Sequence, residues 1–137
     1  MKSTFKISLV VGFLAAVAGA CERKEPEQVG GPGGNAVLRL VPKHHDSLID
    51  STKVYIKYNA SDEPAFYDDS VWCVQENGVP VATFSGLRKG NYYLYARGFD
   101  PDVPITPGVW WNSDGGFSHT IETEQTYNLT ISISEAH

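Results

Sequence analysis

Three short stretches of this 137-residue chain carry side chains that could bind a ligand. His44-His45-Asp46 supplies two imidazoles and a carboxylate, which are donors suited to Zn²⁺ or Cu²⁺. Adjacent histidines point to opposite faces of a strand, so only a loop would let them converge, with His119 as a conceivable further ligand from another strand. Because no second ligand pair accompanies them, a turn with exposed histidines is favoured over a metal site.

Trp110-Trp111, followed by Asn112 and Asp114, is the second candidate. Two indoles beside hydrogen-bonding groups could form a stacking platform for sugar rings. In a strand, however, one indole would face the core and the other solvent, so one exposed Trp is also expected without any ligand.

The acidic stretch from Asp62 to Asp69 offers oxygen ligands for Ca²⁺, but it lacks the regular spacing and central glycine of a calcium loop. A solvated loop is the expected structure. Cys73 lies in an apolar run and is expected to be a buried, inert side chain. A nucleophilic cysteine would need a neighbouring base, and no histidine adjoins Cys73 in the sequence.

The sequence contains no Gly-x-Ser-x-Gly, no glycine-rich phosphate loop opening a helix and no His-Glu-x-x-His. We therefore expect a protein that is not an enzyme and needs no cofactor.

The N-terminal residues have the layout of a secretory signal, with a short basic segment followed by the uncharged run 7–17. Ala18-Gly19-Ala20-Cys21 resembles a bacterial lipobox, although leucine is more common than alanine at the first position. The resemblance implies that residues 1–20 are removed and that Cys21 is acylated, which anchors the protein to the outer membrane, facing the periplasm or the cell surface. Residues 21–34, rich in charge and then glycine, are expected to form a flexible tether.

Removal of residues 1–20 would leave 117 residues, enough for one domain. Two of the 11 basic residues, Lys2 and Lys6, leave with the signal, so 9 remain against 16 acidic residues and the formal charge is −7. That balance argues against nucleic acid and against an anionic membrane surface as partners. A protein or glycan partner stays unidentified at this stage.

From residue 35 onward the apolar residues recur with a period of two, which is typical of half-buried strands. The pattern predicts strands at 36–41, 52–60, 70–75, 79–84, 91–99, 109–111, 117–122 and 127–133, with turns that include Asp114-Gly115-Gly116. No amphipathic helix is evident. We predict an all-β fold, a single small antiparallel β-sandwich of about seven strands over residues 35–137.

The run from Ala82 to Ala96 contains Gly86-Leu87-x-x-Gly90-x-Tyr92 and resembles the turn and core strand of transthyretin-like domains, including carboxypeptidase regulatory-like modules. Leu87 is expected to close the end of the sandwich, and Tyr92, Leu94 and Ala96 to point inward. Such modules are mostly non-catalytic. The resemblance therefore implies a binding or scaffold role, and together with the lipobox resemblance it predicts a non-catalytic cell-envelope lipoprotein; the alternative is a small-ligand binder for a metal ion or a glycan.

Overall fold

The structure is a computed structural model that describes residues 29–136. All the regular secondary structure in this range is β-strand, so the predicted all-β class is confirmed. The expected signal sequence, Cys21 and most of the expected tether lie outside the described residues. No helix in the described range is long and apolar enough to cross a membrane.

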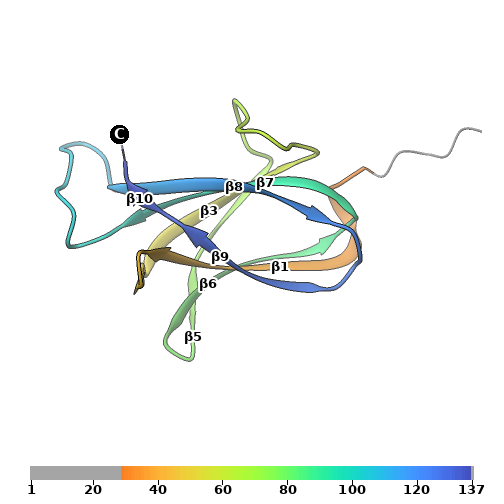
Figure 1. Cartoon of the computed structure of the whole chain (residues 1–137), viewed down its shortest axis with the longest axis horizontal. Coiled ribbons are helices and arrows are strands. Elements are labelled where there is room, and N and C mark those ends of the chain that lie inside the picture. The colour runs from red at the N-terminus through yellow and green to blue at the C-terminus, as the bar shows by residue number, and fades with distance from the viewer. Residues whose placement is uncertain (1–28, 137) are drawn as a thin grey trace, which may run out of the picture.

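The strands form two sheets that Figure 1 shows as facing layers. Sheet A contains β1 (Pro32–His44), β2 (Ser47–Leu48), β5 (Val74–Glu76), β6 (Val79–Leu87) and β9 (Thr126–Ser132). Sheet B contains β3 (Ser51–Tyr58), β4 (Asp69–Trp72), β7 (Gly90–Phe99), β8 (Ser113–Ile121) and β10 (Ser134–Glu135). Seven of these strands have four or more residues, which matches the predicted sandwich.

The pairing is antiparallel throughout sheet B, in the order β10-β8-β7-β3-β4. In sheet A the order is β2-β1-β6-β5, and β9 pairs with β1 in the parallel sense. This parallel pair is a departure from the expected purely antiparallel sandwich. A parallel neighbour needs a long connection, and the chain between β1 and β9 crosses to sheet B and back.

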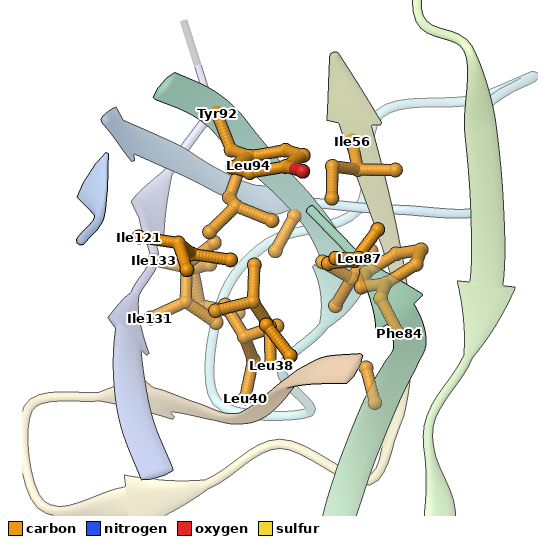
Figure 2. Packing of buried hydrophobic residues seen from close by; sticks show 14 of the residues in the cluster. Leu38, Leu40, Ile56, Phe84, Leu87, Tyr92, Leu94, Ile121, Ile131 and Ile133 are labelled. Atoms are coloured by element: carbon orange, nitrogen blue, oxygen red, sulfur yellow. The ribbon is translucent and has the colours of Figure 1, made fainter. Parts of the chain in front are cut away.

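The core lies between the sheets and is built from the inward positions of β1, β3, β6, β7 and β9 (Figure 2). Alternation of buried and half-buried residues along β3 and β7 places one side of each strand in this core. The largest fully buried side chains include Tyr92, Leu38, Leu40, Ile56, Leu94, Ile121 and Ile131.

The segment around Leu87 and Tyr92 has the buried role that the sequence predicts, since both side chains are almost completely shielded. The Tyr92 hydroxyl donates a hydrogen bond to the Arg88 carbonyl, 2.7 Å away and four residues upstream, as in the tyrosine corner of β-sandwiches. The same hydroxyl accepts the Gly31 N–H at 2.7 Å. Gly90 is needed because a Cβ there would lie 2.8 Å from the Gly30 backbone.

The end of the expected tether belongs to the fold. Gly30 and Gly31 are buried, and β1 begins at Pro32 rather than after residue 35. The Gly30 N–H donates to the Asn59 side chain, and the Gly31 N–H donates to the Tyr92 hydroxyl. Because both partners are distant in sequence, composition alone predicted a flexible segment.

Three of the local predictions, two strands and one turn, differ from the structure. Residues 109–111 form no strand, because they end a proline-containing loop between β7 and β8. Asp114-Gly115-Gly116, predicted as a turn, lies in β8, where Gly116 leaves room for the Tyr93 side chain. The predicted strand 70–75 is two strands, and the chain passes at Cys73 from sheet B to sheet A.

Candidate functional site

The outer side of sheet B carries a regular array of aromatic and cationic side chains. Its inner strands β3 and β7 turn alternate residues to solvent, and the register places Tyr55 opposite Tyr95 and Lys53 opposite Arg97. On β4, Trp72 is the register partner of Lys53. Because residues opposite each other in antiparallel strands have neighbouring side chains, these five residues form one continuous surface.

The loop between β3 and β4 adds a third tyrosine to this surface. In Figure 1 that loop, coloured yellow-green, rises on the outer side of sheet B. The Tyr67 ring stacks on the Tyr95 ring, with centroids 5.7 Å apart and an interplanar angle of 11°, and lies 5.5 Å from the Tyr55 ring. A hollow of about 170 Å³ is lined by Tyr55, Ala65, Tyr67, Tyr95 and Arg97.

The cations of this surface lie against ring faces. The Arg97 guanidinium carbon is 4.4 Å from the Trp111 ring centroid and 5.8 Å from that of Tyr55. Lys53 Nζ is 5.5 Å from the Tyr55 centroid and 5.6 Å from that of Trp72. Both cations therefore lie within cation–π range of Tyr55.

Two hydroxyls of the surface remain protonated at neutral pH. Burial, assisted by a hydrogen bond to the Asp114 carboxylate, raises the pKa of Tyr95 to about 12, and the Tyr95 hydroxyl donates to that carboxylate at 2.6 Å. Burial also raises the pKa of Tyr67. Within the described part of the chain the buried Tyr67 hydroxyl has no hydrogen-bond partner. A buried donor of this kind costs about 1–3 kcal/mol unless a ligand or water pairs with it.

Trp110 and Trp111 both belong to the edge of this surface rather than to the core. Trp110 is 44% exposed, and its ring centroid lies 4.9 Å from that of Trp72, which is 52% exposed. Trp111 is half-buried beneath Arg97. The expectation that one of the pair is exposed is confirmed for Trp110, but the expected burial of the other in the core is wrong, because both lie in a loop and not in a strand. We name the set Lys53, Tyr55, Tyr67, Trp72, Tyr95, Arg97, Trp110 and Trp111 the aromatic face.

A polar clamp fixes the loop that carries these two indoles. His44 Nδ1 lies 2.6 Å from Asp100 Oδ2, and both side chains are largely buried. The Asn112 amide closes the loop by donating to the carbonyls of Asp100 and Val103 and by accepting the Asp100 N–H. The hydrogen bond from His44 holds the pKa of the Asp100 carboxyl below its usual value. The clamp therefore ties the end of β1 to both ends of the loop.

The histidine pair that was considered as a metal ligand makes other contacts in the structure. His45 stacks on the His44 ring at a centroid distance of 4.5 Å, while the close carboxylate partner of His44 is Asp100. In the described residues 29–136, no three His, Cys, Asp or Glu side chains, Asp46 among them, are grouped to hold a metal ion. His119 lies against the Tyr127 ring, 4.9 Å between centroids, and burial lowers its pKa.

The acidic stretch makes structural contacts, and Cys73 packs against the core but is only half-buried, not fully buried as expected. Asp68 accepts the Tyr58 N–H at 2.8 Å and lies 3.3 Å from Lys57 Nζ. Burial raises the pKa of the Cys73 thiol to about 12, so the reactive thiolate is scarce at neutral pH.

Sequence reasoning missed most of the aromatic face. Tyr55, Tyr95 and Trp72 were recognised only as strand residues, and Arg97 was not singled out. The available signal was the recurrence of tyrosine and a cation at the outward positions of two strands, Lys53-x-Tyr55 and Tyr95-x-Arg97. These two pairs of residues are neighbours because of the β3–β7 register, which cannot be read from the sequence.

The fold and the aromatic face define a small two-sheet β protein with one aromatic surface. No protein-family model matches the chain, and no curated protein matches it. Among solved structures, a DUF3823 family protein from Parabacteroides merdae is similar over 75% of this chain and 47% of its own, at 14% identity and a TM-score of 0.39. A candidate cell adhesion protein from Bacteroides eggerthii is similar over 77% of this chain and 41% of its own, at 13% identity and a TM-score of 0.35. The chain thus spans less than half the length of either protein.

Proposed function

We propose that this chain is a lipid-anchored, non-catalytic module of the bacterial cell envelope that binds carbohydrate on its aromatic face. The single observation that carries the proposal is the grouping of rings on that face: Tyr55, Tyr67 and Tyr95 lie together, Trp72 lies against Trp110, and Lys53 lies over one ring of each group. The faces of Tyr and Trp rings stack on the C–H faces of sugars, and a grouped exposed aromatic surface marks a binding site.

The non-catalytic character is part of the proposal. Two carboxylates beside the face are already engaged, Asp114 with the Tyr95 hydroxyl and Asp68 with Lys57 and the Tyr58 N–H. Catalysis by a carboxylate pair needs two such groups on either side of a substrate bond. Membership of the transthyretin-like class is likewise proposed, from the Leu87 and Tyr92 motif and its buried place in the sandwich.

The position of the chain ends supports the anchoring scheme. In Figure 1 the first described residues lie at one end of the sandwich and the loop between β7 and β8 at the other. A lipid on Cys21 would therefore tether the end opposite to Trp110 and Trp111, leaving the aromatic face accessible in the periplasm or at the cell surface. The anchor itself rests on the lipobox resemblance.

The anchor is tested by replacing Cys21 with Ser and separating membranes from soluble protein. Wild-type chain is expected in the membrane pellet and the variant in the soluble fraction. Retention of the variant in the pellet would contradict lipid anchoring. Protease treatment of intact cells then distinguishes exposure at the cell surface, where the domain is degraded, from a periplasm-facing domain that is protected.

Carbohydrate binding is tested by electrophoresis of the purified full-length chain through gels that contain neutral or acidic polysaccharides. The Trp72→Ala, Trp110→Ala double variant is expected to lose the retardation that the wild type shows. Leu48→Ala is the matched control, because Leu48 is 40% exposed on sheet A and away from the face. Retardation of no polysaccharide, or equal retardation of both variants, would refute the proposed function.

A further inference from the structure

We propose that the aromatic face selects an acidic saccharide, whose carboxylate or sulfate binds between Lys53 and Arg97 while its ring stacks on the neighbouring aromatic side chains. This inference rests on the proposed carbohydrate-binding function and names the substrate class. It is carried by the placement of two cations that the fold sets side by side without a carboxylate between them.

Lys53 and Arg97 are direct register partners on β3 and β7, and both are outward-facing positions. Like charges directly opposite each other on paired strands are destabilising. In the described part of the chain the ion pairs involve Arg39, His44 and Lys57, and neither Lys53 nor Arg97 has one. A bound anion would relieve this repulsion.

The carboxylate in register with Arg97 on the next strand already accepts another hydrogen bond. Asp114 is the register partner of Arg97 on β8, but its carboxylate accepts the Tyr95 hydroxyl at 2.6 Å. Arg97 reaches it only through Tyr95, whose hydroxyl accepts the Arg97 Nε–H at 3.2 Å. The hydrogen-bond neighbours of the guanidinium are thus the hydroxyls of Tyr95 and Tyr55, and within the described residues its charge has no carboxylate partner, which leaves it available to an anion.

The charge of the molecule is otherwise unfavourable for anions, since the chain carries a formal net charge of −5. Against that background Lys53 and Arg97 lie side by side on the outer side of sheet B, while the neighbouring Lys57 is already paired with Asp68. The attraction is therefore local, and the binding should weaken with salt.

An acidic saccharide fits this surface better than an acidic peptide. β3 and β7 are interior strands of sheet B, paired on both sides, so their backbone groups are not free to pair with an added peptide strand. At Lys53 and Arg97, recognition must therefore use side chains. Trp72 is 52% exposed and flanks Lys53, which gives a sugar a ring to stack on beside that cation.

The test compares polygalacturonate with its methyl ester, which keeps the sugar backbone and removes the charge, and dextran sulfate with dextran. Binding to the full-length chain in a neutral detergent is measured by calorimetry. We expect the wild type to bind at least one acidic polymer ten times or more tightly than its neutral counterpart. The polymer preferred identifies carboxylate or sulfate as the ligand group.

The Lys53→Gln, Arg97→Gln double variant is expected to lose that preference by at least tenfold, since one hydrogen bond to a charged group is worth about 1.5–3 kcal/mol and 1.4 kcal/mol is tenfold. Lys43→Gln with Lys89→Gln removes the same charge elsewhere and should change binding less than twofold. Circular dichroism verifies that both variants are folded.

Equal binding of an acidic polymer and its neutral counterpart, or an unaffected double variant, would overturn this inference while leaving carbohydrate binding intact. Binding of poly-glutamate as tight as that of the acidic saccharides would also overturn it, because charge alone would then be recognised. Binding of no saccharide would refute the proposed function together with the inference.

Discussion

The outer sides of the two sheets differ sharply in composition although the same sandwich supports both. In sheet A the outer residues of β1 are Val37, Arg39, Val41 and Lys43 and those of β9 are Thr126, Asn128, Thr130 and Ser132, so neither strand turns an aromatic side chain outward. The outer residues of β3 and β7 include the aromatic side chains Tyr55, Tyr93, Tyr95 and Phe99 together with lysines and an arginine. A sheet that only covers a core needs no aromatic residues on its outer side. The aromatic pattern of sheet B is therefore an addition to what folding requires.

The core beneath the two faces supports both equally, and damage there gives the largest effect. Leu87 is 3% exposed at the end of the sandwich. Leu87→Ala is expected to lower the free energy of unfolding by about 2–5 kcal/mol, from lost burial and the cavity left behind. Urea denaturation followed by circular dichroism measures this. A loss no greater than that of Leu48→Ala would show that the Leu87 site is not the packed position described.

Most of the architecture could be read from the sequence because strand periodicity reports which residues face inward. Leu87, Tyr92, Leu94 and Ala96 are all buried as predicted. The predicted strand at 109–111 was wrong because an apolar triplet resembles a strand wherever it occurs, while the prolines of the preceding loop prevent a ladder.

The aromatic face could be predicted only in part. Periodicity assigns Tyr55 and Arg97 to the outer side of their strands, but it does not say which strand lies beside which. The pairing of His44 with Asp100 joins residues 56 positions apart, so no local pattern could indicate it. Tyr67 lies in a loop without periodicity, and its stacking on Tyr95 follows from the path of that loop.

The interaction of His44 with Asp100 links β1 of sheet A to the loop beside the aromatic face. The pKa of Asp100 is lowered by the His44 hydrogen bond, so its contribution to stability is present above the carboxyl's unfolded pKa of about 3.9 and is lost as the pH falls through the lower folded value. Asp100→Asn is expected to cost about 1–3 kcal/mol at pH 7. Denaturation at pH 7 and pH 2.5 should show a smaller difference between wild type and variant at the acidic pH. An equal difference at both pH values would contradict the paired carboxylate.

The exposed indole gives the smallest effect on stability. Trp110 packs on Trp72 at the surface and contributes nothing to the core, so Trp110→Ala is expected to change the free energy of unfolding by no more than about 0.5 kcal/mol. The same urea titration measures it. A loss of 2 kcal/mol or more would mean that Trp110 is a structural side chain, and the aromatic face would then end at Trp72.

The most direct test of the account is nuclear magnetic resonance of the ¹⁵N-labelled full-length chain titrated with short galacturonate oligomers. Binding on the aromatic face predicts amide shifts concentrated in β3, β4, β7 and the loop from residue 100 to 112, with the Trp111 indole N–H among those that move. Amides of β1, β6 and β9 should stay in place, because the sandwich separates sheet A's outer side from the ligand. Shifts centred on β1 and β9, or spread evenly over both sheets, would contradict the claim that sheet B carries the binding surface.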